Sequence, residues 1–388
     1  MMDKARILIG GGGIGGLTTA LAMLREGYEV EVYEGARTWG NVGAGVTLAP
    51  NAMIGFDHLG IGDAIAARSM EPDTQAVRHW SDGRVLLTLE RGDRMRREYG
   101  APYLYTHRAD LHEILADAVT DAGGTIHLAS RIASVAADAE GASITLTDGR
   151  TASGDLLVGA DGVKSVVRQM FEPAPAHFTG HIAFRAVVPV TEALREFADR
   201  PGSVIGPGRI VVFYPLREGS LINIVFFARQ SGWTEEGWTI PATRAELREI
   251  FAGWCQPVQT MIDEAIEGQL FKWAINARAP LKSWTIQDRI VLMGDAAHAM
   301  TPFMGQGASS AIEDAVILAR ALKASDDLPA ALARYEAARI ERTTMIQAES
   351  NANADRMQGD DTDMFGMTNL VNEETLGLFA YDCATVAI

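Results

Sequence analysis

The sequence predicts an α/β fold, and three features support this expectation. The chain opens with a short apolar strand, a glycine-rich turn and a helix. Between about residues 173 and 280 the composition changes to long apolar and aromatic strands separated by turns, and beyond this region the strand, glycine-rich turn and helix return. Strand–turn–helix units form parallel sheets and successive strands form antiparallel ones. We therefore expect a Rossmann-like unit with an inserted antiparallel sheet and C-terminal helices.

The first glycine-rich turn has the spacing of a dinucleotide-binding site. The strand "ILIG" leads into Gly11, Gly13 and Gly16, which fit G-x-G-x-x-G, and a helical pattern begins at Leu17. The first glycine allows the tight bend, the second lets a pyrophosphate approach the backbone, and the third lets helix and strand pack closely. Glu34 ends the next strand, near the roughly 20-residue spacing of the acid that binds the ribose hydroxyls. The pair predicts an adenosine with a free 2′-OH, as in FAD or NAD.

Composition excludes several classes of function. The chain has 388 residues, 47% of them hydrophobic, and a net charge of -16 from 34 basic and 50 acidic residues. Nucleic-acid binding requires clustered Lys and Arg, so we expect no nucleic-acid partner. No apolar run approaches 18 residues and no cleavable signal fits, so we expect a cytoplasmic protein without a membrane partner. With two cysteines and scattered histidines, we expect no metal site.

Other segments carry weaker signals. "NVGAGVTLAPNAM" predicts a glycine-rich loop that lines a cavity, followed by a helix from about Pro50. Two alternating apolar runs flank Asp82 and Gly83 and predict a hairpin. "THRADLHEILADAVTDAGG" and the segment from about Leu328 to Ala354 predict helices. The last 30 residues have few regular signals, so we expect them to wrap the surface.

Two further glycine–acid motifs end later strands. In "LLVGADGVKSVVR" a strand ends at Asp161, and in "VLMGDAAHAMTPFMGQGASS" another ends at Asp295, before a glycine-flanked helix start. An aspartate at a strand end can accept hydrogen bonds from a polyol, and such a helix start can stabilise negative charge on a flat ring. The three motifs together indicate more than a simple dehydrogenase.

In their order and intervals, the three motifs resemble those of the single-component FAD-dependent aromatic hydroxylases with the p-hydroxybenzoate hydroxylase fold. "REYGAPYLYTHRADLH" and "ESNANADR" resemble the subgroup of salicylate hydroxylase, 3-hydroxybenzoate 6-hydroxylase and 6-hydroxynicotinate 3-monooxygenase. The resemblance covers nearly the whole chain and implies bound FAD, with NADH or NADPH as transient electron donor. By this resemblance the cofactor-binding residues are Gly11, Gly13, Gly16, Glu34, Arg108, Asp161, Gly162, Arg168, Gly294, Asp295, Pro302, Gly305, Gln306 and Gly307.

The resemblance and the inserted strands together suggest a discontinuous division of the chain. We expect an FAD-binding domain over residues 1–75, 100–172 and 281–345, a substrate-binding domain over 76–99 and 173–280, and a C-terminal helix and tail over 346–388.

The resemblance also implies the reaction. NAD(P)H reduces FAD, O2 adds at the flavin C4a, and the distal oxygen of the hydroperoxide passes to an electron-rich ring. We therefore expect a monooxygenase that hydroxylates a one-ring hydroxy-aromatic carboxylate resembling salicylate, hydroxybenzoate or hydroxynicotinate, as a monomer or homodimer. Two alternatives stay open at this point: a flavin oxidoreductase of the same fold without oxygen insertion, and a non-catalytic flavin- or nucleotide-binding regulator.

Candidate catalytic residues are Tyr214, His298 and Pro302. Tyr214 ends an apolar stretch of the inserted sheet that should face the flavin. His298 lies three residues beyond Asp295, and Pro302 precedes the glycine-flanked helix start.

Candidate substrate-binding residues are Tyr214, Arg185, Thr47 and Phe303. Arg185, or alternatively Arg217, could pair bidentately with a substrate carboxylate. Thr47 and Phe303 stand where the hydroxynicotinate enzymes carry histidines, so a pyridine substrate held by those histidines is not expected.

Overall fold

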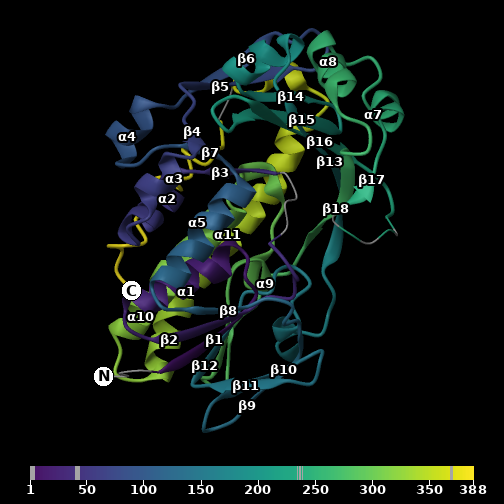
Figure 1. Cartoon of the computed structure of the whole chain (residues 1–388). Helices are drawn as coiled ribbons and strands as arrows, with labels where there is room; N and C mark the ends of the chain where they lie inside the picture. The colour runs from purple at the N-terminus through teal and green to yellow at the C-terminus, as the bar shows by residue number, and fades with distance from the viewer. Residues whose placement is uncertain (1–4, 40–43, 234, 236, 238, 368–369) are drawn as a thin grey trace.

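The structure is a computed structural model that describes residues 5–39, 44–233, 235, 237, 239–367 and 370–388. Two large sheets lie at opposite ends of the molecule, and the 30-residue helix α11 (Leu328–Met357) runs from one to the other (Figure 1). No helix in the described part of the chain has the length and apolar character needed to cross a membrane.

The first sheet has six strands in the order β19-β20-β12-β1-β2-β8 and is parallel except for β19. Its strands are β1 (Arg6–Gly10), β2 (Glu29–Tyr33), β8 (Thr125–His127), β12 (Leu156–Gly159), β19 (Thr285–Ile286) and β20 (Ile290–Leu292). The register pairs Gly10 with Gly159, and Gly159 with Leu292. The ends of β1, β12 and β20 therefore meet at one edge, and each leads into one of the three predicted motifs.

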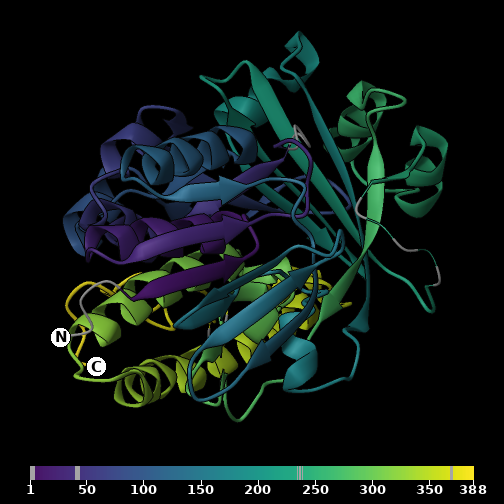
Figure 2. The same cartoon turned by 60° about the horizontal axis from the view of Figure 1, so that its bottom comes forward.

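Helices cover one face of this sheet and a small sheet contacts the strands. Helix α1 (Ile14–Arg25) contacts α5 (Arg108–Asp121) on one side and α10 (Gly307–Lys323) on the other, and α10 contacts α11. An antiparallel sheet of β9 (Ile132–Ala137), β10 (Ala142–Leu146) and β11 (Thr151–Gly154) contacts β1 and β12 (Figure 2). Both faces of the central strands are thus covered, which explains why β12 is buried throughout.

The second sheet has eight strands in the order β17-β18-β13-β16-β15-β14-β5-β6 and is antiparallel except for the pair β14 and β5. Its strands are β5 (Thr74–His79), β6 (Val85–Glu90), β13 (His177–Pro189), β14 (Gly202–Gly206), β15 (Arg209–Leu216), β16 (Leu221–Arg229), β17 (Ile240–Pro241) and β18 (Phe271–Ala277). The fold class expected from the sequence, a parallel α/β sheet with an inserted, largely antiparallel one, is confirmed.

The two faces of the second sheet pack differently. Phe226 points into a cluster with Leu247 of α7 (Arg244–Ile250) and Met261 of α8 (Gln256–Glu264), whereas its neighbour Phe227 packs near Phe303 on the opposite face. Because side chains alternate along a strand, one face of the sheet is closed by helices. The other face is left to line the site described below.

A third sheet joins the two halves, with β7 (Leu104–His107) between β3 (Gly45–Leu48) and β4 (Ser69–Met70). Residues 45–48 were expected as loop, and their strand forms through the distant partner β7. The remaining helices are α2 (Pro50–His58), α3 (Gly62–Ala66), α4 (Asp93–Tyr99), α6 (Arg195–Asp199), α9 (Gly294–His298), η1 (Val167–Met170), η2 (Glu192–Leu194), η3 (Pro302–Met304) and η4 (Thr362–Met364).

The C-terminal tail corrects one expectation. Leu378, Phe379 and Cys383 are fully buried, so the tail is part of the core as well as of the surface. Phe379 packs edge-on against Tyr99 and Tyr103, at ring distances of 5.7 and 6.0 Å. Apolar residues spaced irregularly along an irregular segment give no periodic signal, which is why the sequence did not indicate this burial.

Candidate active site

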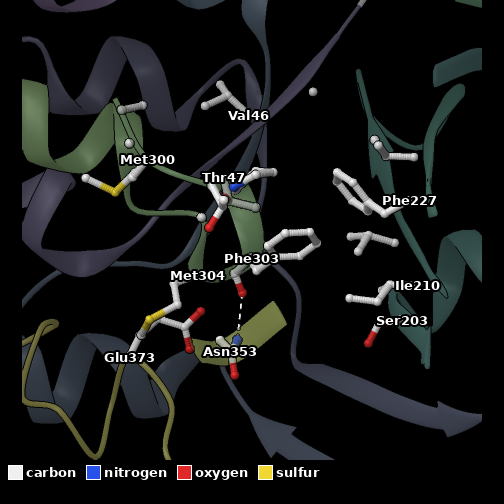
Figure 3. Close-up of a pocket in the computed structure, with 18 of the residues that line it drawn as sticks. Val46, Thr47, Ser203, Ile210, Phe227, Met300, Phe303, Met304, Asn353 and Glu373 are labelled. Atoms are coloured by element: carbon white, nitrogen blue, oxygen red, sulfur yellow. Dashed lines mark hydrogen bonds between the residues drawn. The ribbon is translucent and has the colours of Figure 1, made fainter. Parts of the chain in front are cut away.

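A cavity of about 590 Å³ opens between the motif-bearing edge of the first sheet and the inner face of the second. Its walls come from the glycine turn after β1, from β3, from the segment between α9 and α10, from strands β5, β6, β13 to β16 and β18, and from the C-terminal tail. Figure 3 shows Thr47 and Phe303 near its centre and Ile210 and Phe227 on the side of the second sheet. The volume lies within the range of small-molecule and cofactor sites.

Each of the three positions in the first motif requires glycine for a different structural reason. Gly11 has φ +106°, and a Cβ there would lie 2.4 Å from the carbonyl oxygen of Ala160. A Cβ at Gly16 would lie 2.0 Å from the carbonyl oxygen of Gly11. At Gly13 a Cβ would meet nothing within 4 Å, and Gly13 lines the cavity. Two glycines therefore allow backbone packing, and the middle one leaves open space for a ligand at the start of α1.

Glu34 is held by the backbone of the same turn. Its Oε2 accepts a 2.8 Å hydrogen bond from Gly12 N–H, and its Oε1 accepts a 2.7 Å bond from Ala36 N–H. A carboxylate has about four acceptor positions, so acceptor capacity remains for a ribose. A Cβ at Gly12 would lie 3.1 Å from the Cβ of Glu34, which gives this additional glycine a packing reason.

Asp295 brings a free carboxylate to the cavity. Gly294, with φ +54°, turns the chain after β20, and its N–H binds Asp314 Oδ2 at 2.9 Å. Asp295 is exposed to the cavity while protein surrounds it, and no hydrogen bond to its carboxylate forms within the described residues. Burial raises the pKa of Asp295, and the nearby His298 and Arg108 lower it. Such a carboxylate is ready to accept hydrogen bonds from a ligand.

The start of α10 and the start of α5 complete this end of the site. Gly305 has φ +63°, and Gly305 and Gly307 line the cavity at the N-terminus of the 17-residue helix α10. Arg108, the first residue of α5, also lines the cavity and has an exposed side chain. The free N–H groups of a helix start and a guanidinium both favour an anionic group.

Arg185 is an enclosed cation on the second sheet. Its guanidinium lies 4.5 Å from the centre of the Trp273 ring, and it lines the cavity. Burial lowers the pKa of Arg185 to about 10, with Tyr214 raising it and Arg108 lowering it further. No carboxylate of the described residues pairs with Arg185.

Tyr214 lies beside this cation. Its ring stacks on Tyr105 at 4.5 Å with an interplanar angle of 13°, and a Cβ at Gly45 would strike the ring. Burial raises the pKa of Tyr214, so the hydroxyl keeps its proton at neutral pH. Its hydroxyl has no hydrogen-bond partner in the described part of the chain, and the residue lines the cavity.

The donor set fits FAD. A glycine cradle with space for a pyrophosphate, an unpartnered carboxylate for a polyol, and a helix start for an electron-rich ring lie along one cavity. No cluster of three or more His, Cys, Asp or Glu side chains suited to a metal ion occurs among the described residues.

Comparison with known proteins agrees with this geometry. A family model described as FAD binding domain matches residues 4–350. The 3-hydroxybenzoate 6-hydroxylase of Polaromonas naphthalenivorans is 37% identical over 351 residues, which cover 89% of this chain and 86% of that protein. The chain belongs to the FAD-dependent aromatic hydroxylases. The resemblance inferred from the sequence, with its FAD cofactor and monooxygenase class, is confirmed.

Other hydroxylases and monooxygenases are similarly related. The 6-hydroxynicotinate 3-monooxygenase of Pseudomonas fluorescens is 34% identical, with 91% of this chain and 92% of that protein covered. The aurachin C monooxygenase/isomerase of Stigmatella aurantiaca is 38% identical, with 90% and 89% covered. The crystal structure of Klebsiella pneumoniae HpxO complexed with FAD and uric acid superposes with a TM-score of 0.85 at 26% identity, over 98% of this chain and 96% of that one.

Several predicted residues of this hydroxylase line the cavity. They are Gly13, Thr47, Arg108, Gly162, Arg185, Tyr214, Gly294, Asp295, Pro302, Phe303, Gly305 and Gly307. Thr47 packs against Gly305, because a Cβ added at Gly305 would lie 2.9 Å from the Oγ1 of Thr47. Phe303 packs between His181 and Phe227, at ring distances of 5.0 and 5.2 Å.

The side chains of three predicted cofactor-binding residues bind other protein groups, and these residues do not line the cavity; their cofactor role stays a prediction. Asp161 accepts hydrogen bonds from the Ser165 hydroxyl and the Val166 N–H, the latter at 2.7 Å. Arg168 is fully buried and donates to carbonyl oxygens, including that of Ala297 at 2.6 Å. The Oε1 of Gln306 accepts a 3.0 Å bond from Asn51. These side chains hold the turns, and the neighbouring residues Gly162, Gly305 and Gly307 line the cavity.

The expectations for His298 and Arg217 are also corrected. The Nε2 of His298 lies 2.6 Å from Asp314 Oδ2 in the protein interior, and His298 does not line the cavity. Asp314 also pairs with the buried Arg339, so His298 belongs to a structural ion-pair network. Arg217 donates to Asp110 at the surface, with an Nη2–Oδ1 distance of 2.6 Å, and is therefore not available to a substrate.

The sequence did not indicate one polar part of the cavity wall. Gln75 donates to the Tyr105 hydroxyl at 2.5 Å and accepts from Arg91 Nε at 2.8 Å, and Tyr103 and Glu373 complete this part of the cavity lining. One signal was available, because the two tyrosines of "APYLYTH" stand two residues apart, which places both on one face of a strand. Nothing local marks Gln75, Arg91 or Glu373.

Proposed function

We propose that this hydroxylase inserts one oxygen atom of O2 into a one-ring hydroxy-aromatic carboxylate, with Arg185 holding the carboxylate. The observation that carries the proposal is the enclosed Arg185 guanidinium, which lies over Trp273 with no protein carboxylate beside it. A buried cation is costly unless it is paired, so a ligand carboxylate is the natural partner. Arg forms bidentate pairs with carboxylates, which would also orient the ring.

The names of the relatives support this substrate class. One is a 3-hydroxybenzoate 6-hydroxylase, another a 6-hydroxynicotinate 3-monooxygenase, and a third, from Streptomyces platensis, a 3-amino-4-hydroxybenzoate 2-monooxygenase. All three names describe one ring with a carboxylate and a hydroxyl group. Neither Thr47 nor Phe303 has an imidazole that could hold a pyridine substrate, so a hydroxybenzoate is favoured over a hydroxynicotinate.

We propose the following roles for the cofactor-binding residues. The turn at Gly11, Gly13 and Gly16 would hold the pyrophosphate at the start of α1, and Glu34 the adenosine ribose. Asp295 would accept hydrogen bonds from the ribityl hydroxyls. The flat ring would then lie against the backbone of Pro302 and the residues that open α10.

FAD reduced by NAD(P)H supplies the oxygen-activating chemistry, and the protein contributes position and exclusion of water. Ile210, Phe227 and Phe303 form an apolar wall that keeps water from the reacting ring. The hydroxyl of Tyr214 keeps its proton and can donate a hydrogen bond to an oxygen atom of the substrate. Arg185 sets the direction in which the ring lies.

The test is a panel of hydroxybenzoates, aminohydroxybenzoates and hydroxynicotinates, scored by NAD(P)H oxidation, hydrogen peroxide and identified product. A hydroxylated product from a carboxylated phenol is expected. NAD(P)H oxidation with a reduced but never a hydroxylated organic product would favour the flavin oxidoreductase without oxygen insertion, and no oxidation with any compound would favour the regulator.

A variant tests the role of Arg185. Arg185→Gln should weaken binding of the carboxylated substrate by about 10- to 150-fold, because a charge-assisted pair of about 1.5–3 kcal/mol is lost. FAD content should stay at the wild-type level. The matched control is Arg195→Gln, since Arg195 is exposed on α6. Equal binding of the substrate by the Arg185 variant would refute the proposal, and so would equal weakening for an analogue without the carboxylate.

Three sequence-based expectations stay predictions: the domain boundaries, the cytoplasmic location, and the monomeric or homodimeric state. Both cysteines are free and buried, and the proposed reaction consumes NAD(P)H, which supports a reducing compartment.

A further inference from the structure

Glu373, from the C-terminal tail, brings a second carboxylate to the cavity. Figure 3 shows its side chain beside Met304, with the carboxylate directed inward. No side chain of the described residues donates a hydrogen bond to it. Its own backbone N–H is the one hydrogen-bond donor to it among the described residues. Buried carboxylates with few donors are costly, and such groups concentrate at functional sites. The irregular tail, expected only to wrap the surface, therefore places an acceptor in the active site.

The neighbouring residues hold Glu373 in this position. Glu374 points the other way, toward Arg91, Arg94 and Tyr99, and its Oε1 accepts a 3.3 Å hydrogen bond from the Tyr99 hydroxyl. Asn372 Oδ1 accepts the N–H groups of Glu374 and Thr375 at 3.1 and 2.9 Å. The backbone is thus anchored on both sides of Glu373, which holds this residue at the cavity wall.

The other groups lining the cavity are poorly suited to act as a base. Burial raises the pKa of Tyr103, Tyr105 and Tyr214, so all three phenols keep their protons. No histidine occurs among the lining residues that the structure describes. The other carboxylate, Asp295, follows the glycine turn at the cofactor end of the cavity.

The charges around Glu373 fit a proton acceptor. Burial raises the pKa of Glu373 above its ordinary value. Its own backbone N–H and Arg91 lower this pKa, and the Glu374 carboxylate raises it. The remaining ionisable groups of the cavity are Tyr103, Tyr105, Arg108, Arg185, Tyr214 and Asp295. A carboxylate with a raised pKa is a better base near neutral pH than one exposed to water.

We propose that Glu373 is the base that accepts the proton of the substrate's ring hydroxyl. This inference rests on the proposed function. The O–H bond of the substrate breaks, the proton passes to a carboxylate oxygen of Glu373, and the electron pair stays on the ring oxygen. There it raises the electron density of the ring carbons ortho and para to it, where oxygen is inserted.

Glu373 takes up one proton and returns it, so it adds none to the overall balance. After insertion the attacked ring carbon loses its hydrogen as a proton, the ring oxygen recovers its own proton from Glu373, and the carboxylate is regenerated. The second oxygen atom of O2 leaves as water. Overall, the ring C–H, O2, NAD(P)H and one proton from solvent give the ring C–OH, NAD(P)+ and water, and the family's reaction already supplies O2 and NAD(P)H.

The test compares pairs of ligands in Glu373→Gln. The probes are 3-hydroxybenzoate and 3-amino-4-hydroxybenzoate, each paired with the analogue lacking the hydroxyl, and binding is read from the perturbed flavin absorbance of the holoenzyme. The variant should bind the hydroxylated member about 10- to 100-fold more weakly and its partner unchanged. FAD content should match the wild type. Glu249→Gln, exposed on α7, is the control.

The pH dependence gives a second measurement, in the wild type and in two variants. In the wild type, kcat/KM should fall at low pH as Glu373 becomes protonated, and substrate binding should weaken there only for the hydroxylated ligand. Glu373→Asp should retain this acidic limb and Glu373→Gln should lack it. Equal binding losses for both members of a ligand pair, or an acidic limb that survives in Glu373→Gln, would overturn the inference.

Different results would overturn the role of Glu373 and the proposed function. Normal hydroxylation by Glu373→Gln overturns the role of Glu373 alone. If the wild type forms no hydroxylated product from any member of the panel, the proposed function fails and the role of Glu373 fails with it.

Discussion

The Asp295 carboxylate should destabilise the apoprotein and stabilise its complex with FAD. Its carboxylate is enclosed by protein and has no hydrogen-bond partner within the described residues, and burial raises its pKa. In the apoprotein this charge is therefore unfavourable. In the complex it accepts hydrogen bonds from the ribityl chain, each worth about 1.5–3 kcal/mol because the acceptor is ionised. Replacement by Ala should weaken FAD binding by about 10- to 150-fold per hydrogen bond lost.

The sign of the pH effect follows from the raised pKa of Asp295. The folded apoprotein holds the proton of this group more tightly than the unfolded chain does, so ionisation favours unfolding. Asp295→Asn should therefore raise the Tm of the apoprotein at neutral pH. This gain should disappear below about pH 4, the ordinary pKa of an aspartate, because both states are then protonated.

Two measurements on the same preparations decide the matter. FAD is removed, the Tm of the apoprotein is recorded from pH 4 to 8, and FAD is added back while its fluorescence is followed. Asp117→Asn, exposed on α5, should change neither quantity. If Asp295→Asn binds FAD as tightly as the wild type and its apoprotein is no more stable, the assignment of Asp295 to the cofactor is wrong.

Two further predictions concern the glycine turn and the buried ion pairs. Gly13→Ala should leave the Tm of the apoprotein near the wild-type value and weaken FAD binding. Gly16→Ala should lower the Tm, because its Cβ would lie 2.0 Å from a backbone oxygen, at a cost of about 1–3 kcal/mol. Equal Tm losses in the two variants would contradict this interpretation. Asp314→Asn should lower the free energy of unfolding in urea by no more than about 3–5 kcal/mol, because the buried Arg339 loses one of its two carboxylate partners and keeps Glu313. The pKa of Asp314 is lowered to about 2 by His298 and Arg339 against the opposing effect of burial, so its stabilisation is complete above about pH 4 and lost as the pH falls toward 2. Wild-type unfolding curves that are unchanged between pH 5 and 2 would refute this account.

The parts of the fold that could be predicted are those with local signals. The glycine turn, the helix from Arg108 and the helix from Leu328 follow from spacing and periodicity within a short window. Strand β3 and the tail could not be predicted in the same way. Gly45 to Leu48 are extended because they pair with β7, and Glu373 reaches the cavity because Glu374 is held by α4. Both depend on partners distant in the sequence.

The sequence predicted the position of the candidate site but not the direction of its single side chains. The three motifs mark turns that meet at one edge of the sheet, because the parallel register brings Gly10, Gly159 and Leu292 side by side. The direction of single side chains could not be read in this way. His298 and Asp295 stand three residues apart on one short helix, yet one enters a buried ion pair and the other enters the cavity.

Side chains that bind backbone groups of the turns, rather than facing the cavity, explain how an acidic protein can hold a cofactor with two phosphates. Asp161 and Arg168 use their polar atoms on backbone groups of the turns, and so fix the conformation of those turns. The surface left for the ligand at this end is then mostly backbone N–H groups, glycine and the guanidinium of Arg108, with Asp295 as its one carboxylate among the described lining residues. Fixed amide dipoles at a helix start attract a phosphate without adding net charge to the chain. Because the turn-forming side chains act through the backbone, their replacement should reduce FAD affinity and protein stability together, whereas replacement of Asp295 separates the two.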